Sequence, residues 1–307
     1  MRNPCDGIIL IDKNGGETSF GVVKKIRQVL NVKKAGHAGT LDPFATGLLV
    51  VLLGQGTKLS SYLMSGEKTY HGTIRLGVET DTQDPTGQVI QTRPVPDIKP
   101  EDIKEEAMGF IGEIEQVPPI FSAVRYGGKR AYELARNGIK VDLEKRKVKI
   151  HSLKIISVDL PDVTIEVTCS RGTYIRSLAT DLGKRLGPGG HLKELRRLSS
   201  APFTVTDALN LKHMGFTSTK SASQDRIIPL REALPQLKEM QVDGRMAHKI
   251  RNGYQPEWEE VAAGSDMPNS YKGYMKLVKG IDLVAIIKVC NLSGDDKEWL
   301  KITRVFN

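Results

Sequence analysis

Hydrophobic residues recur along this chain at characteristic spacings, and these spacings predict where strands and helices lie. Continuous apolar runs at 7–11 and 48–53 predict two buried strands. Between them, apolar residues recur every three positions from Phe20 to Val29, behind a candidate cap at Thr18 or Ser19, which predicts a helix. Alternating apolar and polar residues at 69–76 and 163–169 predict half-buried strands.

The second half of the chain shows the same mixture. Pro100 begins a predicted helix, and another follows 171–173 and closes at the glycine-rich stretch 187–190. Basic helices are also predicted at 129–136 and, from leucines at 192, 195 and 198, at 192–198. Because strands and helices do not alternate strictly, we expect an α+β fold with a mixed, mainly antiparallel central sheet flanked by helices. The strand-like run 283–289 predicts a small β-rich domain over 236–307, after a larger one over 1–235.

Composition narrows the class of protein. The chain has 307 residues, of which 39% are hydrophobic and 26% charged, as expected of a globular protein with a substantial core. Its longest apolar run is far shorter than the roughly 18 residues of a membrane span, and its first residues lack the apolar stretch of a secretory signal. Three widely separated cysteines fit neither a disulfide framework nor a zinc site. We therefore expect a reduced, cytoplasmic protein without membrane association.

The positive charge of the chain is clustered. The net charge is +9, and the segment 118–151 holds nine Lys and Arg against three Asp and Glu, whereas 78–117 holds three against ten. This segment also carries Pro118-Pro119 and Gly127-Gly128, so we expect an excursion from the core. A solvated helix face would explain part of this clustering, but a nucleic-acid partner explains it better.

Several familiar sites are absent from the sequence. There is no phosphate-binding loop of the Gly-x-x-x-x-Gly-Lys-Ser/Thr type and no His-Glu-x-x-His pair. Gly54-Gln55-Gly56 begins like a dinucleotide fingerprint, but Leu59 occupies the position of the third glycine. We therefore expect neither a nucleotide cofactor nor a metal.

Asp42 is the strongest candidate for chemistry. An aspartate before a proline is most often a turn residue, and by residue type alone that interpretation is favoured. Glycine and small residues on both sides, at 36–40 and 45–47, would however let a ligand approach the backbone closely. A carboxylate held in such a loop is suited to covalent or acid–base work.

The segment Gly36–Leu49 (GHAGTLDPFATGLL) resembles the signature loop of the TruB family of pseudouridine synthases. Further blocks match this family in the expected order: Leu10-Ile11-Asp12-Lys13, Lys68-Thr69-Tyr70, 171–176 (RGTYIR) and 195–198 (LRRL). The resemblance spans roughly 6–232. Asn14 departs from the pattern, since the family often has proline there. The match of the C-terminal part to a small PUA-like RNA-binding domain is much weaker.

The resemblance implies that the enzyme converts uridine to pseudouridine in tRNA, at uridine 55 of the T loop in the bacterial stand-alone members. Asp42 would be the essential carboxylate, either attacking C1′ or removing the 2′ proton, and Arg176 would pair with it. Tyr70 would stack on the target base, although a tyrosine in an alternating strand is more often part of the core. Such a reaction needs no cofactor.

The resemblance also implies the substrate contacts. His37 would fill the space that a flipped base leaves, and Lys13, Tyr174 and Leu195 would belong to the substrate-binding site. Four basic side chains of the excursion would bind the backbone of the T arm: Arg125, Lys129, Arg130 and Arg136. No obligate protein partner is implied, and we expect a monomer.

Two other functions remain possible on the sequence alone. The first is a non-catalytic protein that binds or folds tRNA, for which the basic segment would matter and Asp42 would not. The second is a glycoside hydrolase, which would need a second carboxylate in a matching motif, and none stands out.

Overall fold

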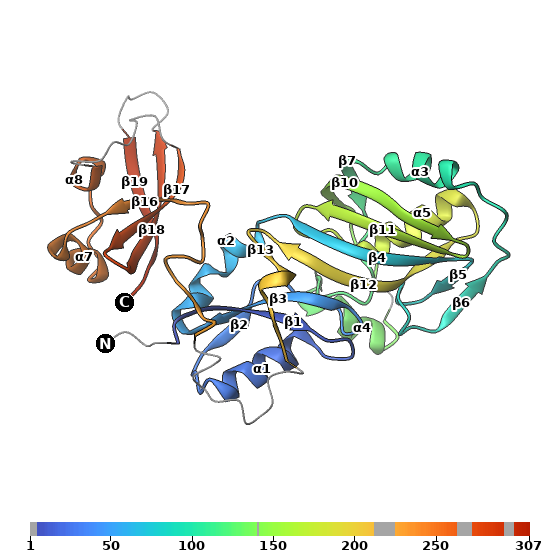
Figure 1. Ribbon diagram of the computed structural model, residues 1–307, viewed down its shortest axis with the longest axis horizontal. Coiled ribbons are helices and arrows are strands. Elements are labelled where there is room, and N and C mark those ends of the chain that lie inside the picture. Colours follow the sequence, from blue (N-terminus) through green and yellow to red (C-terminus); the bar gives the residue numbers. More distant parts are fainter. Residues whose placement is uncertain (1–4, 140, 212–224, 263–271, 292–297) are drawn as a thin grey trace.

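The computed structural model describes residues 5–139, 141–211, 225–262, 272–291 and 298–307. A large mixed sheet forms its centre, in the order β14-β1-β3-β12-β4-β11-β10-β7, with β2, β13 and β15 paired alongside (Figure 1). Only β1–β14 and β3–β12 pair in parallel among the described strands of this sheet, so the predicted mainly antiparallel α+β architecture is confirmed. Its strands are β1 (Gly7–Lys13), β2 (Ala35–His37), β3 (Thr46–Leu53), β4 (Lys68–Leu76), β7 (Gly112–Gln116), β10 (Arg146–Asp159), β11 (Asp162–Cys169), β12 (Gly190–Ser200), β13 (Phe203–Thr204), β14 (Leu209–Asn210) and β15 (Ile228–Pro229).

Helices cover different parts of this sheet. Helix α1 (Ser19–Val29) packs Val22, Val23 and Ile26 against β1 and β3, and the hydroxyl of Thr18 caps it by accepting from Gly21 N. Helices α3 (Pro100–Met108) and α5 (Ile175–Leu186) bury their apolar sides in one core with β4, β10, β11 and β12. The 3-10 helix η1 (Gly54–Leu59) and helix α2 (Ser60–Met64) follow β3, and η2 (Val205–Asp207) lies near the end of the sheet. The sheet thus holds the ends of β2, β3, β4 and β12 and the start of α5 in one rigid frame.

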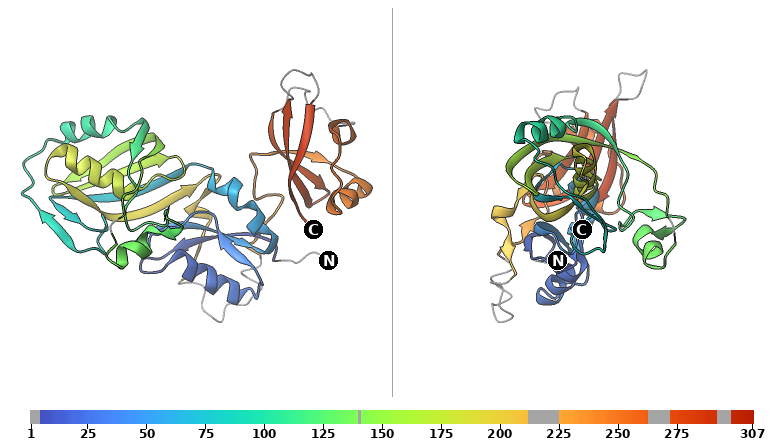
Figure 2. Two further views of the ribbon diagram at one scale, coloured as in Figure 1. Left: turned by 180° about the vertical axis from the view of Figure 1, so that it is seen from behind. Right: turned by 90° about the vertical axis from the view of Figure 1, so that its right-hand side faces the viewer.

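Two smaller segments leave the sheet. One is the hairpin of β5 (Val78–Thr80) and β6 (Val89–Thr92). The other is the basic excursion, which carries β8 (Arg125–Tyr126), β9 (Lys129–Arg130) and α4 (Ala131–Arg136) and stands to one side of the sheet in Figure 2. The excursion has a small core of its own, formed by Val124, Ala131, Leu134, Val141 and Leu143.

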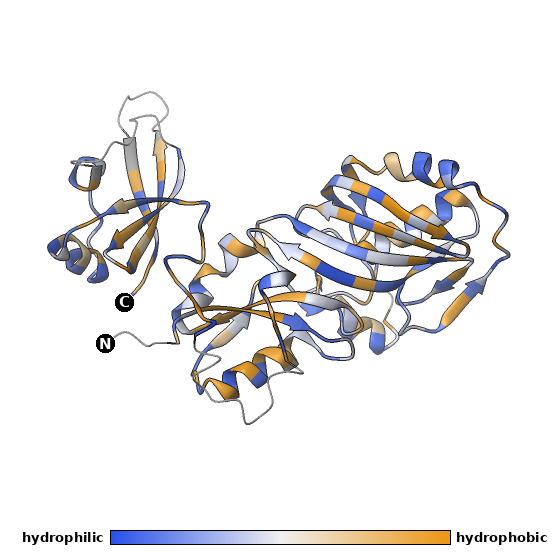
Figure 3. Ribbon diagram, in the orientation of Figure 1, coloured by the Kyte–Doolittle hydropathy of each residue, from blue (hydrophilic) through white to orange (hydrophobic). Residues whose placement is uncertain are grey.

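A second sheet forms the C-terminal part of the chain, as the strand-rich pattern predicted. Its order is β16 (Lys238–Gln241), β17 (Gly273–Lys279), β18 (Asp282–Asn291) and β19 (Glu298–Val305), with α7 (Gly244–Arg251) and α8 (Trp258–Ala262) beside it. Figure 3 shows apolar residues, in orange, along the strands of both sheets. The second sheet is not isolated, because Val278 and Phe306 are buried in the same cluster as Leu52 and Leu63 of the first part.

The prediction of a short basic helix at 192–198 is wrong, because this segment is the middle of β12. Register shifts between Leu192 and Glu194 and between Arg197 and Ser199, against β4, explain the error. Each β-bulge adds one residue to the strand, so the inward-facing positions Leu192 and Leu195 are three residues apart instead of two. This bulged strand imitates the spacing of a helix. The predicted helix at 129–136 is also shorter, since α4 begins only at Ala131.

Among the residues that the structure describes, each helix is too short or too polar to traverse a lipid bilayer.

Candidate active site

Asp42 lies in the loop that joins β2 to β3, and neighbouring elements fix this loop tightly. The hydroxyl of Ser19, at the start of α1, accepts from Leu41 N at 2.8 Å and donates to Leu41 O at 3.1 Å. The side chain of Leu41 is buried in the core below. The side chain of Asp42 itself is 31% exposed, so a ligand can reach its carboxylate.

Arg176, in the first turn of α5, forms an ion pair with Asp42. Its Nη2 donates to Oδ1 at 3.0 Å, and its Nε lies 2.9 Å from Oδ2. These two residues are 134 positions apart in the chain, and the family resemblance predicts that they pair. The two-point contact fixes both the position of the carboxylate and its orientation.

The guanidinium of Arg176 is itself held by three further groups. It donates to the carbonyls of Thr82 at 2.9 Å and Phe121 at 3.1 Å, and its Nη1 lies 3.5 Å from Oδ2 of Asp84. Asp84 is buried, and it belongs to a segment that the sequence analysis did not connect to the site. Its Oδ1 accepts from the hydroxyls of Thr82 and Thr86, as in an ordinary polar turn. Arg176 therefore bridges two carboxylates.

Opposing effects set the pKa of Asp42. Burial raises it above its usual value, and the negative charge of Asp84 raises it further. The charge and hydrogen bond of Arg176 oppose this increase, as does the charge of Lys13. The pKa of Asp42 stays above its usual value, and without the arginine partner it would be higher still.

Lys13 is fully buried and contacts only backbone in the structure. Its ammonium donates to the carbonyls of Asn14 at 2.9 Å, Glu17 at 2.8 Å and Pro43 at 3.1 Å. Burial lowers its pKa to about 8, against the opposing charges of Glu17 and Asp42. Lys13 thus orders the residue that follows Asp42, and the implied role in direct substrate binding does not fit a side chain without exposed surface. Asn14 takes part through its carbonyl, which a proline would also offer.

Tyr70, on β4, lies directly opposite Arg197 of β12 in the strand register. The Tyr70 side chain packs against the core that contains Leu195. Asp42 lies close enough to Tyr70 for its negative charge to raise the pKa of the phenol. Burial raises that pKa most, while the charge and hydrogen bond of Arg197 lower it. Arg197 was not among the predicted site residues, although the motif LRRL contains it.

The remaining predicted site residues lie around this centre at different depths. Tyr174 immediately precedes α5, exchanges two hydrogen bonds with the side chain of Gln116, and packs against the small core of the excursion. His37 ends β2, and burial and the charge of Arg197 lower its pKa. The predicted RNA-binding residues of the excursion are all exposed: Arg125, Lys129, Arg130 and Arg136.

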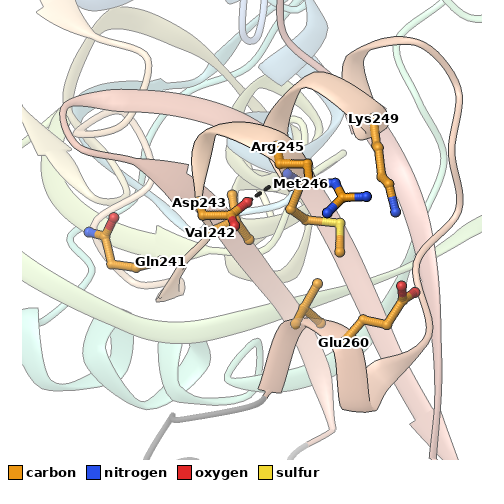
Figure 4. Close-up of a pocket in the computed structure, with 8 residues that line it drawn as sticks. Gln241, Val242, Asp243, Arg245, Met246, Lys249 and Glu260 are labelled. Carbon is orange, nitrogen blue, oxygen red and sulfur yellow. Dashed lines mark hydrogen bonds between the residues drawn. The ribbon is translucent and has the colours of Figure 1, made fainter.

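A hollow of about 380 Å³ lies in the C-terminal part, between α7 and α8. Figure 4 shows the side chains that line it. Its two carboxylates are engaged locally, since Asp243 caps α7 through Met246 N and Glu260 accepts from the hydroxyl of Tyr254. Within the described ranges, no cluster of three or more His, Cys, Asp or Glu side chains is arranged to hold a metal ion. The candidate chemistry therefore centres on Asp42.

Comparison with known proteins identifies the family of this chain. The model of the TruB family pseudouridylate synthase N-terminal domain matches residues 27–175, and the model of the tRNA pseudouridylate synthase B C-terminal domain matches residues 176–235. The chain is 42% identical to tRNA pseudouridine synthase B of Geobacter sulfurreducens, over 98% of this chain and all of that protein. It is also 42% identical to the protein of the same name from Clostridium kluyveri, over 88% of this chain and 92% of that one.

Solved structures give the same result. A chain in the crystal structure of a Cbf5-Nop10-Gar1 complex superposes with a TM-score of 0.74, at 25% identity, over 98% of this chain and 85% of that chain. Two family models together cover the segment that carries Asp42, Tyr70, Arg176 and Leu195, and the relatives extend over nearly the whole length. The chain belongs to the TruB family of pseudouridine synthases.

Proposed function

We propose that this enzyme converts uridine 55 in the T loop of tRNA to pseudouridine, with Asp42 as its essential carboxylate. The observation that carries the proposal is the two-point contact of Asp42 with Arg176, at 2.9 and 3.0 Å, on a carboxylate that remains accessible. Relatives that match nearly the whole chain are named for action on tRNA, which supports the class of substrate.

The reaction breaks the C1′–N1 bond, turns the uracil and joins C5 to C1′. Asp42 either attacks C1′ or removes the 2′ proton, and both roles require the ionised form. Burial alone would favour the protonated form, so Arg176 supplies the charge that keeps Asp42 active. The protein itself provides the required groups, so the proposed step involves no metal or cofactor.

Tyr70 and Leu195 form the apolar side of the proposed site. Because its pKa is raised, the phenol of Tyr70 is neutral near pH 7 and is suited to stack on the uracil. Leu195 is buried in the same cluster, and Tyr174 adds a ring beside the first turn of α5. An apolar surface here would keep water from the sugar while its bond to the base is broken.

The target base is stacked within a folded loop, so the enzyme must flip it out, at a cost of about a few kcal/mol. We propose that His37 fills the vacated space. The exposed basic side chains of the excursion, including Arg125 and Lys129, would bind the phosphates of the T arm. The PUA-like C-terminal part would extend this RNA contact, and the enzyme would act as a monomer in the cytoplasm.

The proposal is tested by mapping pseudouridine in tRNA after incubation with the protein and no additives. Carbodiimide labelling should mark position 55 of the wild-type reaction and leave a tRNA with cytidine at that position unmarked. If the protein binds tRNA in a salt-sensitive way but forms no pseudouridine, the non-catalytic alternative is correct. A mark at another uridine would confirm the chemistry and refute the proposed position.

A further inference from the structure

Arg197 is a buried cation without an anionic partner. It is 1% exposed, and its donors are directed to three backbone carbonyls: Nε to Leu48 at 2.7 Å, Nη2 to Gly39 at 3.1 Å and Nη1 to Thr40 at 3.4 Å. Within the described part of the chain, no carboxylate forms an ion pair with it. Two other arginines do have anionic partners: Arg196 pairs with Asp12 at 2.8 Å, and Arg176 bridges two carboxylates.

A buried charge is costly when no opposite charge lies beside it. Carbonyl oxygens can be satisfied by neutral donors, so ordering the loop does not by itself require a cation. Lys13 lies near the negative charges of Glu17 and Asp42, and Arg176 pairs with Asp42 and Asp84. Arg197 has no such carboxylate beside it among the described residues, so no ion pair neutralises its positive charge.

The positive charge of Arg197 acts on the side of the site that carries Tyr70. Arg197 and Tyr70 are cross-strand partners, and the charge and hydrogen bond of the guanidinium lower the pKa of the phenol. The same charge lowers the pKa of His37. The carbonyls of Gly39 and Thr40 tie the cation to the loop that carries Asp42. The charge of Arg197 thus lies on the side of the site where the proposed function puts the uracil.

Resting on that proposed function, we propose that Arg197 stabilises the negative charge that the uracil acquires when its bond to the ribose breaks, acting through the phenol of Tyr70. When C1′–N1 breaks, the electron pair of the bond stays on N1 and spreads over the uracil carbonyls. In the same step Asp42 loses its charge, by bonding to C1′ or by taking the 2′ proton. Negative charge therefore moves from the Arg176 side of the site to the Arg197 side. When C5 joins C1′, this electron pair forms the new bond. In the same step either the bond between Asp42 and C1′ breaks and its electron pair returns to the carboxylate, or Asp42 gives the 2′ proton back to the sugar. C5 then loses its proton and N1 takes one up, so the carboxylate and the proton count are restored.

In this account Arg197 is a positioning residue, because Tyr70 and not Arg197 touches the base. Its effect should depend on how well the base carries negative charge. The test compares two T-arm stem-loops, with uridine or 5-fluorouridine at the target, because fluorine stabilises the uracil anion. Both are followed under single-turnover conditions by nuclease digestion and chromatography with mass detection, which separates the starting nucleoside from its carbon-linked product. The product of 5-fluorouridine keeps its fluorine, because its C5 carries no proton to lose.

Arg197→Met, which removes the charge, should slow the uridine reaction by up to about 100-fold, the lower end of the loss seen when a donor in direct contact with a developing anion is removed. It should slow the 5-fluorouridine reaction by at least ten times less. Ser19→Ala is the matched control, because Ser19 also orders the loop at Leu41 but carries no charge. That variant should slow both substrates by the same factor.

Arg197→Lys keeps the charge and keeps the test informative if the methionine variant does not fold. It should slow both substrates by similar factors and so preserve the wild-type ratio of the two rates. Equal slowing of both substrates by Arg197→Met, or a changed ratio in Arg197→Lys, would overturn the inference while wild-type activity still supports the proposed function. A wild-type enzyme inactive on both RNAs would instead refute the proposed function itself.

Discussion

Removing the charge of Arg176 should move the acid side of the pH–rate profile to higher pH. The substitution Arg176→Met keeps an unbranched apolar stem but removes the cation, whose Nε and Nη2 lie 2.9 and 3.0 Å from the oxygens of Asp42. Two charges about 4 Å apart interact by about 4 kcal/mol at an effective dielectric constant of about 20, equivalent to about 3 pKa units. Because the Asp42 side chain is 31% exposed, water screens the pair, and we expect an increase of about 1 to 2 units.

The sign follows from the active form of Asp42. The carboxylate acts ionised, so the rate is lost as pH falls through its pKa, and a higher pKa brings that loss at higher pH. The assay is single-turnover pseudouridine formation at saturating RNA over a series of pH values. Arg176→Lys is the control, because it keeps the charge and should retain an acid limb near that of the wild type, though with a slower rate. If the methionine variant is slower by the same factor at every pH, Arg176 does not control the ionisation of Asp42.

Three further predictions concern stability and binding. Gly47→Ala should lower the free energy of unfolding in urea by about 2 to 5 kcal/mol, since φ is +98° and the added Cβ would lie 2.3 Å from a backbone oxygen of β12. Gly36→Ala is the control and should change this free energy little, because the nearest atom to its added Cβ is 3.9 Å away. Similar losses for both variants would contradict this reasoning. Phe306→Ala should cost about 3 to 5 kcal/mol in thermal or urea unfolding, because this ring is buried between the two parts of the chain, and an unchanged stability would refute that role. Replacing both Arg125 and Lys129 by alanine should flatten the dependence of log affinity for tRNA on log salt by about 2, whereas an unchanged slope would show that neither binds phosphate.

The fold could be predicted from the sequence where local patterns and packing agree. Thr18 caps α1 and the alternation at 69–76 forms β4, as expected from residue type and spacing. At β12 the spacing is misleading, because a bulge between Leu192 and Glu194 gives a strand the three-residue spacing of Leu192 and Leu195. Bulges depend on the partner strand, which local spacing does not reveal.

The site shows a similar division. Asp42 and Arg176 could be connected only through the family resemblance, and the ion pair between them supports that connection. Asp84 begins the segment Asp-Pro-Thr-Gly, whose residue types are typical of a turn, and it does form one, but it also holds Arg176 from a distant segment. The sequence does not predict Arg197 as a site residue, because a basic residue on a predicted helix is expected to face solvent. In each case the tertiary contact, and not the residue type, sets the role.

The most direct test of the account is the effect of Asp42→Asn on chemistry and on binding, measured on the same T-arm RNA. Asparagine keeps the size of the side chain but can neither attack C1′ as an anion nor remove a proton. We predict that single-turnover pseudouridine formation becomes undetectable while the dissociation constant of the RNA changes by less than about threefold, because exposed basic groups elsewhere supply the affinity. Appreciable turnover by the asparagine variant would contradict the central role of this carboxylate.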